Sequence, residues 1–502
     1  MRHWLAVLAT SLCITPFAWG DALSIAEREW TTYERAHFRF ITDMPEAQAR
    51  SLLERVVQFD QVAAALHEAV LPPDRAPLKV LVFRNRQDFA EVFQFDSFSG
   101  FTLPSLNEHT IALGPDQGGR HLGENTLHEY VHYILRQSPL APLPLWYEEG
   151  YASLLATTRF KEGKAIVGHP GKLRPPARLH VAQNPITVSS ARKNMPLRIG
   201  PRKPFNLRAA LRPGLPEQWP MQEIYAFYTS TWLLVHYLVL GQPEQRTQLA
   251  SHLLHQPSDL LTPAQFATQF GLTDEELQRT LSRYARRRSL PTTEIDLETT
   301  DEQTQVRKLS APEALFELGL ASAPHNPKFA EAAFAHLATL DDEKHRALIG
   351  QAILKRSASK HSEAGVLALR ALRHAPDNTA ARTLLAGAMA DACPNVTTCR
   401  GEWRMAAQHY ETALNLEPHR TDALLGLGAV QFRLGELESA LTHLEAAYSR
   451  APWSARINFF LGEAYRMAGR MAQARKHLYR AARWELNGSW KARAEKALGE
   501  LG

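Results

Sequence analysis

Two histidines and a glutamate stand at a spacing that suits a metal ion. Residues 127–132 read Leu-His-Glu-Tyr-Val-His, which separates His128 from His132 by four positions and sets Glu129 between them. On a helix, these two histidines lie one turn apart on the same face, so both imidazoles can reach one ion. Glu129 lies beside them and can act as the general base on a metal-bound water.

Two helical segments are needed to bring a third ligand to this pair. The first has an apolar face that can anchor it in a core, formed by Leu127, Val131, Ile134 and Leu135. The second, residues 146–155, follows a proline-rich turn that would reverse the chain and return Glu149 to the histidines. Two His, one Glu and an open fourth position form the ligand set of a catalytic zinc site rather than of a closed structural one.

The motifs resemble those of a known family. H-E-x-x-H followed by Leu-Pro-x-Trp-x-x-Glu-Gly-x-Ala at residues 143–152 is similar to the gluzincin metallopeptidases, the clan of thermolysin and aminopeptidase N. The closest resemblance is to the bacterial peptidase MA-like proteins, which often carry tetratricopeptide repeats behind the protease. The resemblance covers residues 28–285 and implies an α+β, thermolysin-like catalytic domain.

The resemblance also implies the roles of the site residues. It assigns one zinc ion per chain to His128, His132 and Glu149, with Glu129 as the base. Glu148 is the rival ligand, because neighbouring helix residues point about 100° apart and only one of them can face the metal. The family places its ligand directly before the glycine, which selects Glu149. The alternative is a pair of helices with a chance histidine pair and solvated carboxylates.

A peptidase of this kind also needs a donor for the oxyanion of the tetrahedral intermediate. The apolar, aromatic helix expected at residues 223–240 offers Tyr225, Tyr228 and His236, of which we select Tyr228. Packing in the core is the alternative role for each of them.

Alternating apolar residues predict strands at 37–42, 78–83 and 110–113, and helical periodicity predicts helices at 46–70 and 86–93. The strand from Thr110 is expected at the sheet edge along the cleft, where substrate backbone could pair by strand addition. An ordinary sheet strand is the alternative. The Pro-, Gly- and Arg-rich stretch 161–212 is either a lid over the cleft or a surface insertion.

The N-terminus predicts export. Residues 1–20 have a short polar start, an apolar run and small residues at the end, which is typical of a secretory signal peptide cut before Asp21. We expect no membrane-spanning segment beyond it and a bacterial periplasmic location. The mature chain then has two cysteines, Cys393 and Cys399, which predict a disulfide in an oxidising compartment, with metal binding as the rival.

The C-terminal part predicts a solenoid of tetratricopeptide repeats. After a catalytic domain at 21–288, the polar, Thr-rich stretch 289–310 is expected to be a linker, and 311–502 an all-α repeat domain. The spacing from Pro418 to Pro452 is 34 residues, the period of this repeat. Four units are expected, at about 345–378, 379–420, 421–454 and 455–488, followed by a helix from Trp490 that caps the stack.

The predicted function is that of an exported zinc peptidase whose repeats bind a protein substrate or partner. A formal charge of +5 with scattered basic residues does not favour nucleic-acid binding. The alternative is a non-catalytic repeat scaffold of the cell envelope with a vestigial or regulated zinc domain. A third possibility is a zinc hydrolase that acts on a non-protein amide.

Overall fold

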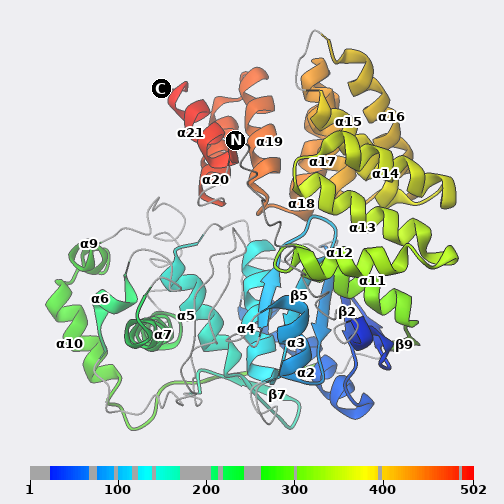
Figure 1. Cartoon of the computed structure of the whole chain (residues 1–502). Helices are drawn as coiled ribbons and strands as arrows, with labels where there is room; N and C mark the ends of the chain where they lie inside the picture. Colours follow the sequence, from blue (N-terminus) through cyan, green and yellow to red (C-terminus); the bar gives the residue numbers. More distant parts are fainter. Residues whose placement is uncertain are drawn as a thin grey trace, which may run out of the picture.

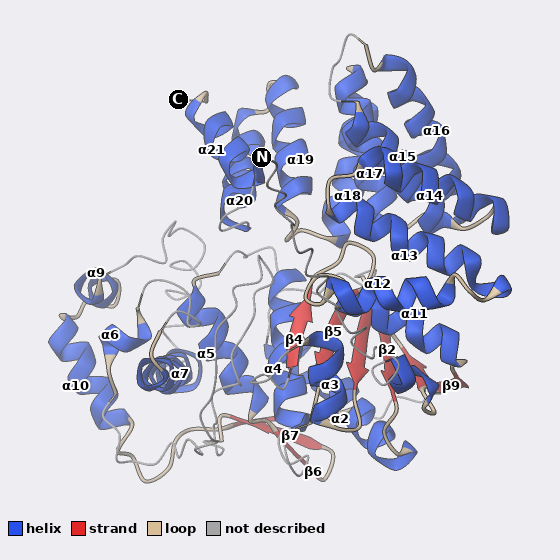
Figure 2. Cartoon of the chain, viewed as in Figure 1, coloured by secondary structure: helices blue, strands red, loops and turns tan. Residues whose placement is uncertain are grey.

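The computed structural model describes residues 23–66, 76–94, 100–115, 122–137, 143–169, 205–212, 219–241, 262–298, 302–393, 398–484 and 489–501. The N-terminal part mixes strands and helices, and the C-terminal part is a stack of helices above it (Figure 1; Figure 2). The predicted signal peptide and the centre of the predicted lid, 170–204, lie outside the described residues.

A six-stranded sheet forms the centre of the N-terminal part. Its strands are β1 Thr31–Arg35, β2 Phe38–Thr42, β3 Leu78–Val82, β4 Gly100–Leu103, β5 His109–Leu113 and β9 Gln305–Lys308. The order across the sheet is β4-β5-β3-β2-β1-β9. The central strand β3 pairs in parallel with β2 and β5, and the outer pairings are antiparallel.

Both faces of this sheet are buried. Successive side chains of a strand point to opposite faces, so Phe40 and Val80 lie in one core while Ile41 and Leu81 lie in the other. The first face is covered by helices α2 (Glu46–Leu66) and α4 (Leu122–Gln137), and this core continues into α5 (Leu145–Ala156) and α7 (Met221–His236). The second face is covered by α3 (Arg86–Phe93), α11 (Ala311–Ser322) and α12 (Pro327–Leu337).

The three strands and two helices predicted for the first 120 residues are confirmed, but the prediction of the sheet edge is wrong. Strand β5, which contains Thr110, is interior, because the unpredicted strand β4 pairs with its outer side. Thus β4, not β5, is the edge strand beside α4.

The stretch 289–310, predicted to be a linker, contributes two strands to the N-terminal part. Strand β8 (Thr293–Asp296) joins β6 (Arg159–Lys161) and β7 (Lys164–Val167) in a small antiparallel sheet, and β9 closes the large sheet against β1. The sequence hides them because β9 is exposed along its whole length and β8 exposes alternate residues, so neither shows an apolar run.

Four charged side chains link the sheet to α11. Arg39 bonds to Glu108 and Glu317 at 2.8 and 2.9 Å, and Lys79 lies 2.7 Å from Glu317 and 3.0 Å from Glu108. Burial alone would raise the pKa of Glu317, but Lys79 and Arg39 lower it to about 2. The two acids and two bases therefore remain charged, which fixes α11 on the sheet.

The repeat helices form antiparallel pairs, as predicted. The pairs are α13 (Lys344–Ser357) with α14 (His361–His374), α15 (Thr379–Ala392) with α16 (Arg400–Leu416), α17 (Thr421–Leu434) with α18 (Leu437–Arg450), and α19 (Ala455–Met467) with α20 (Met471–Trp484). Helix α21 (Ser489–Gly499) follows as the expected final helix. A disulfide joins Cys393 to Cys399 between α15 and α16, which confirms that prediction.

Small residues allow the paired helices to approach closely. A Cβ added at Gly428 would lie 2.7 Å from Leu444, and one added at Gly462 would lie 2.8 Å from Leu478. These are equivalent positions in successive units. The stack touches the N-terminal part at β5 and the loop before it. In the loop, Asn107 accepts a hydrogen bond of 3.1 Å from the Asp422 backbone, and the ring of His109, the first residue of β5, lies 5.1 Å from Trp453.

The remaining elements are short. They are η1 (Ser24–Glu27), α6 (Leu207–Ala210), the π-helical turn η3 (Tyr237–Gly241), α9 (Pro263–Thr268), α10 (Asp274–Tyr284) and η5 (Asp341–Glu343). Contrary to expectation, the continuous helix Gln222–Gly241 is long and apolar enough to cross a bilayer by length and composition. However, 76% of its most apolar 18-residue window is buried inside the fold, as in the core helix of a globular protein.

The core shared by the sheet and α11 predicts that the two parts depend on each other for stability. Leu318 is 1% exposed in that core, so Leu318→Ala should lower the free energy of unfolding by about 2–5 kcal/mol. Leu369→Ala, at a position 47% exposed in α14, is the matched control and should change it little. Urea unfolding followed by tryptophan fluorescence would measure both, and equal effects would contradict a shared core.

Candidate metal centre

Helix α4 presents the two histidines to the interior. Its buried Leu127, Val131 and Ile134 pack into the first core, as the sequence predicts. His128 and His132 are 4% and 2% exposed, and their Nε2 atoms lie 3.2 Å apart. The two ring nitrogens thus converge on one point.

Helix α5 brings Glu149 to that point. Its carboxylate oxygens lie 3.5 Å from His128 Nε2 and 3.8 Å from His132 Nε2. The neighbouring Gly150 permits this placement, because a Cβ there would lie 2.6 Å from the Thr231 carbonyl oxygen of α7. Among the described residues, His128, His132 and Glu149 form a group whose ligand atoms all lie within 4.8 Å of one another.

The donor set fits a zinc ion. Zinc–ligand distances near 2.0–2.1 Å in a tetrahedron give ligand separations of about 3.3 Å, close to those between these three side chains. Glu149 Oε2 is also buried without a hydrogen bond within the part of the chain described, an arrangement that an ion would satisfy. Three protein ligands leave one position for water or substrate.

Glu148 takes a different role from its neighbour. The Nδ1–H of His132 can donate to Glu148 Oε1 at 3.0 Å, on the side of the ring away from Glu149. A carboxylate in this place fixes the tautomer and the orientation of a metal-binding histidine. The structure therefore separates the two adjacent glutamates into one that faces the histidine pair and one that holds His132.

Glu129 is close enough to His128 and His132 for its charge to raise the pKa of both imidazoles, and the edge strand holds its carboxylate. It is 4% exposed, and Thr102 Oγ1 of β4 donates to its Oε2 at 2.7 Å. This bond constrains one carboxylate oxygen and leaves the other for a further partner. Sequence reasoning did not find Thr102, because nothing in residues 100–103 indicates that they pair with a strand and reach α4.

Burial and mutual charge shift the protonation of the ligand set. Burial lowers the pKa of His128 to about 3, so this imidazole is neutral and its lone pair is available. Burial would also lower the pKa of His132, but Glu149 and Glu148 raise it to about 9. Burial raises the pKa of Glu149 to about 7, although His132 and the Tyr228 hydroxyl oppose this shift.

The three candidate oxyanion donors differ in their position relative to the ligand group. Tyr228 is buried, and its hydroxyl interacts with Glu149, which places it at the site. His236 does not reach the site, because its ring nitrogens lie 2.8 Å from the Tyr284 hydroxyl and 2.9 Å from the Gly168 carbonyl oxygen. The side chain of Tyr225 is outside the described residues.

Comparison with known proteins identifies the repeats. Two tetratricopeptide-repeat family models match residues 400–454 and 435–494. The C-terminal helices are therefore tetratricopeptide repeats, a class that provides surfaces for protein–protein interaction. No curated protein matches the chain.

Several solved structures resemble the chain at low identity. A tetratricopeptide-repeat protein of Thermus thermophilus is 19% identical, with 37% of this chain and 98% of that chain covered and a TM-score of 0.32. MamA of Desulfovibrio magneticus is 20% identical, with 32% and 83% covered and a TM-score of 0.26. YrrB, described as a tetratricopeptide-repeat protein with an unusual peptide-binding site, is 19% identical, with 36% and 91% covered and a TM-score of 0.28.

The different positions of Glu149 and Glu148 predict different losses of metal. Wild-type protein should hold about one zinc ion per chain, Glu149→Ala should lose it, and Glu148→Ala should bind it about 10- to 100-fold more weakly. Metal analysis and chelator competition would measure this, with Glu162→Ala at the exposed β6–β7 turn as the control. Absence of zinc from folded wild-type protein prepared without chelator would contradict the ligand assignment.

The raised pKa of His132 predicts proton release on zinc binding. At about pH 7.5 this imidazole, with a pKa of about 9, is protonated, and it must be neutral to bind a metal. Zinc should therefore displace about one proton per chain, and its affinity should rise about tenfold per pH unit towards pH 9. Calorimetric titration in two buffers of different ionisation enthalpy would count the proton, and a buffer-independent enthalpy would refute the prediction.

Proposed function

We propose that the protein is a scaffold that binds a protein or peptide partner through its repeats, and that its N-terminal part adds a zinc-dependent peptidase. The match of the C-terminal helices to tetratricopeptide-repeat models carries the first part. The residues that these models match lie in the C-terminal helices, so the comparisons support a protein-binding scaffold better than a peptidase.

One observation favours the second part. Glu129 is buried, its charge acts on His128 and His132 of the converging ligand group, and one of its oxygens is held by Thr102. A scaffold has no need of a buried carboxylate at this place, whereas a hydrolase needs one as its general base. We therefore retain the gluzincin-type peptidase as the second function.

Different residues of the chain would have different roles in hydrolysis. A zinc ion held by His128, His132 and Glu149 would polarise the scissile carbonyl and lower the pKa of a water molecule. Glu129 would accept the proton of that water on the oxygen that Thr102 leaves open, and would pass it to the leaving amine. Strand β4 lies at the sheet edge beside α4, where an extended substrate could pair with its backbone.

Tyr228 is our candidate for the donor to the oxyanion. It is buried and its hydroxyl interacts with Glu149, so it lies next to the proposed ligand set. A phenol O–H in a site that excludes water stabilises a developing negative charge more strongly than it would in solution.

We further propose that the protein works after export, in an oxidising compartment such as a bacterial periplasm. The disulfide between Cys393 and Cys399 supports this, because such bonds persist in oxidising compartments and are rare in the cytosol. The leader-like composition of residues 1–20 agrees with it.

Digestion of a broad peptide library separates the two functions. We expect zinc-loaded wild type to make defined cleavages, and Glu129→Gln to keep its zinc and lose at least about 100-fold of the activity, because its amide cannot accept the proton. Glu91→Gln, on the remote helix α3, is the control. Undiminished cleavage by Glu129→Gln would refute the base, and no cleavage by zinc-loaded wild type would leave the scaffold function alone.

A further inference from the structure

A row of arginines and aromatic rings crosses the repeats. Helices α13, α15, α17 and α19 are the first helices of successive units. Together with the final helix α21 they contact one another in chain order, which forms a continuous surface that we call the first-helix face. On it, Arg433 of α17 lies 5.9 Å from the Phe460 ring, and Arg456 of α19 lies 6.0 Å from the same ring. Arg456 and Arg493 lie 5.6 and 4.8 Å from the Trp490 ring. We call Arg433, Arg456 and Arg493 the arginine ladder.

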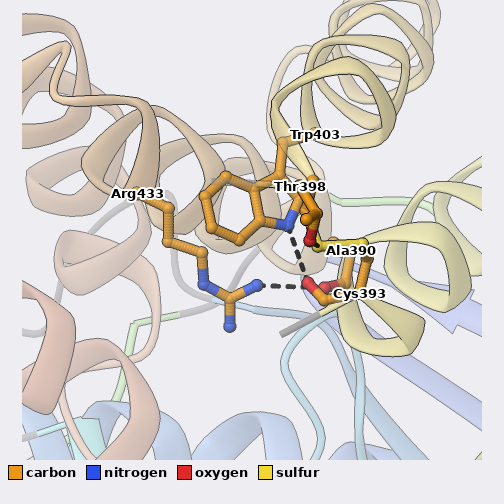
Figure 3. The surroundings of a disulfide bond; sticks show 6 residues. Ala390, Cys393, Thr398, Trp403 and Arg433 are labelled. Atoms are coloured by element: carbon orange, nitrogen blue, oxygen red, sulfur yellow. Dashed lines mark hydrogen bonds between the residues drawn. A yellow bond between two sulfur atoms is a disulfide. The ribbon is translucent and has the colours of Figure 1, made fainter. Parts of the chain in front are cut away.

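The inner end of the ladder is fixed by the loop that carries the disulfide. Trp403 follows Cys399, its indole N–H donates to the Cys393 carbonyl oxygen at 3.1 Å, and its ring lies 5.5 Å from the Arg433 guanidinium. Arg433 also donates to the Ala390 carbonyl oxygen at 3.1 Å (Figure 3). The guanidinium is thus held at one edge by a hydrogen bond and lies near two rings, Trp403 and Phe460, while the side chain stays partly accessible.

Acidic neighbours do not neutralise the ladder. Among the described residues, Asp391 forms an ion pair with the ladder, at 3.6 Å from Arg456, and it is shared with Arg356 at 3.5 Å. Two other acids of α17 and α19 have arginines of their own, since Asp422 pairs with Arg420 and Glu463 with Arg466. Positive charge is therefore in excess along this face.

Two further observations show that Asp391 compensates the charge of these arginines only in part. The Nε–H of Arg456 is buried without a hydrogen-bond partner in the described part of the chain. Burial lowers the pKa of Arg433, and the charges of Arg456 and Arg493 lower it further despite the opposing effect of Asp391. Like charges held this close are unfavourable unless an anion joins them.

We propose that the first-helix face binds an acidic peptide segment, with carboxylates of the peptide bonded to the arginine ladder; this rests on the proposed partner-binding function. Guanidinium edges that are not turned towards the rings can bind carboxylates by two parallel hydrogen bonds. Shared rings place the three arginines one after another across adjacent helices. A short extended peptide, at about 3.3 Å per residue, can span them. The face consists of tetratricopeptide helices, so a peptide is preferred to a nucleic acid.

Binding of a labelled peptide in which Asp and Glu alternate with Ala and Ser tests the proposal. Fluorescence anisotropy at physiological salt would compare full-length wild type with Arg493→Gln and with Arg456→Gln/Arg493→Gln. Each should weaken binding, and the double variant by at least about tenfold. Arg370→Gln, at an exposed position on the second helix α14, is the matched control and should bind as wild type does. Arg493 is exposed, so its single variant should fold even if the double variant does not.

The same peptide with Asn and Gln in place of its acids separates the proposed acidic specificity from the proposed binding of a partner. Weaker binding of the amide peptide by at least about tenfold supports the acidic specificity. If both peptides bind equally well, the acidic specificity is overturned and the proposal of partner binding stands, whether or not the arginine variants lose this binding. Tighter binding of a single-stranded oligonucleotide of equal charge overturns the peptide assignment. Absence of binding of the full peptide library to wild type would refute partner binding itself.

Discussion

The side chains of His128, His132 and Glu149 are buried between α4 and α5, and the arrangement of the N-terminal part depends on satisfying these polar groups. Two imidazoles and a carboxylate inside a core cost free energy unless their lone pairs have partners. The fold meets this cost locally: Glu148 binds the outer nitrogen of His132, and Thr102 binds Glu129. Close packing of α5 against α7 at Gly150 keeps Glu149 in place. Strand β4 of the sheet therefore positions a side chain of the site by a direct hydrogen bond, as the helices do.

The second constraint is the core that the sheet shares with α11 and α12. It contains aromatic side chains of β4 and α3 together with Leu315, Phe329 and Phe334, and the buried ion network of Glu317 reinforces it. Because α13 continues from this pair of helices, the direction in which the repeats leave the N-terminal part is fixed by side-chain packing. Contacts of Asn107 and His109 with the repeats add a second point of attachment. The arginine ladder is thus held in a defined orientation relative to the candidate metal site formed by His128, His132 and Glu149.

Local patterns predicted much of this structure, and long-range pairing accounts for what they missed. The histidine pair and the repeat helices follow from spacings within one or two helices, which sequence shows directly. The choice of Glu149 over Glu148 rests on the resemblance to a family rather than on spacing. Strands β8 and β9 are polar and find their partners far along the chain, and Thr102 reaches Glu129 only once β4 has paired with β5. His236 is a candidate whose alternative role, packing in the core, is the one that the structure shows, because a buried histidine in an aromatic helix looks the same in sequence in either role.

The pairing of β1 with β9 has a consequence for how the protein must be made. The outer edge of strand β1 is covered only after residues 305–308 of β9 have been synthesised. The second face of the sheet remains exposed until α12 has been synthesised as well. Sequence-distant contacts of this kind make folding slow and leave apolar surface exposed meanwhile. A chain that is exported before it folds would tolerate this delay, whereas one folding as it leaves the ribosome would need protection by a chaperone until at least residue 337, the end of α12, is available.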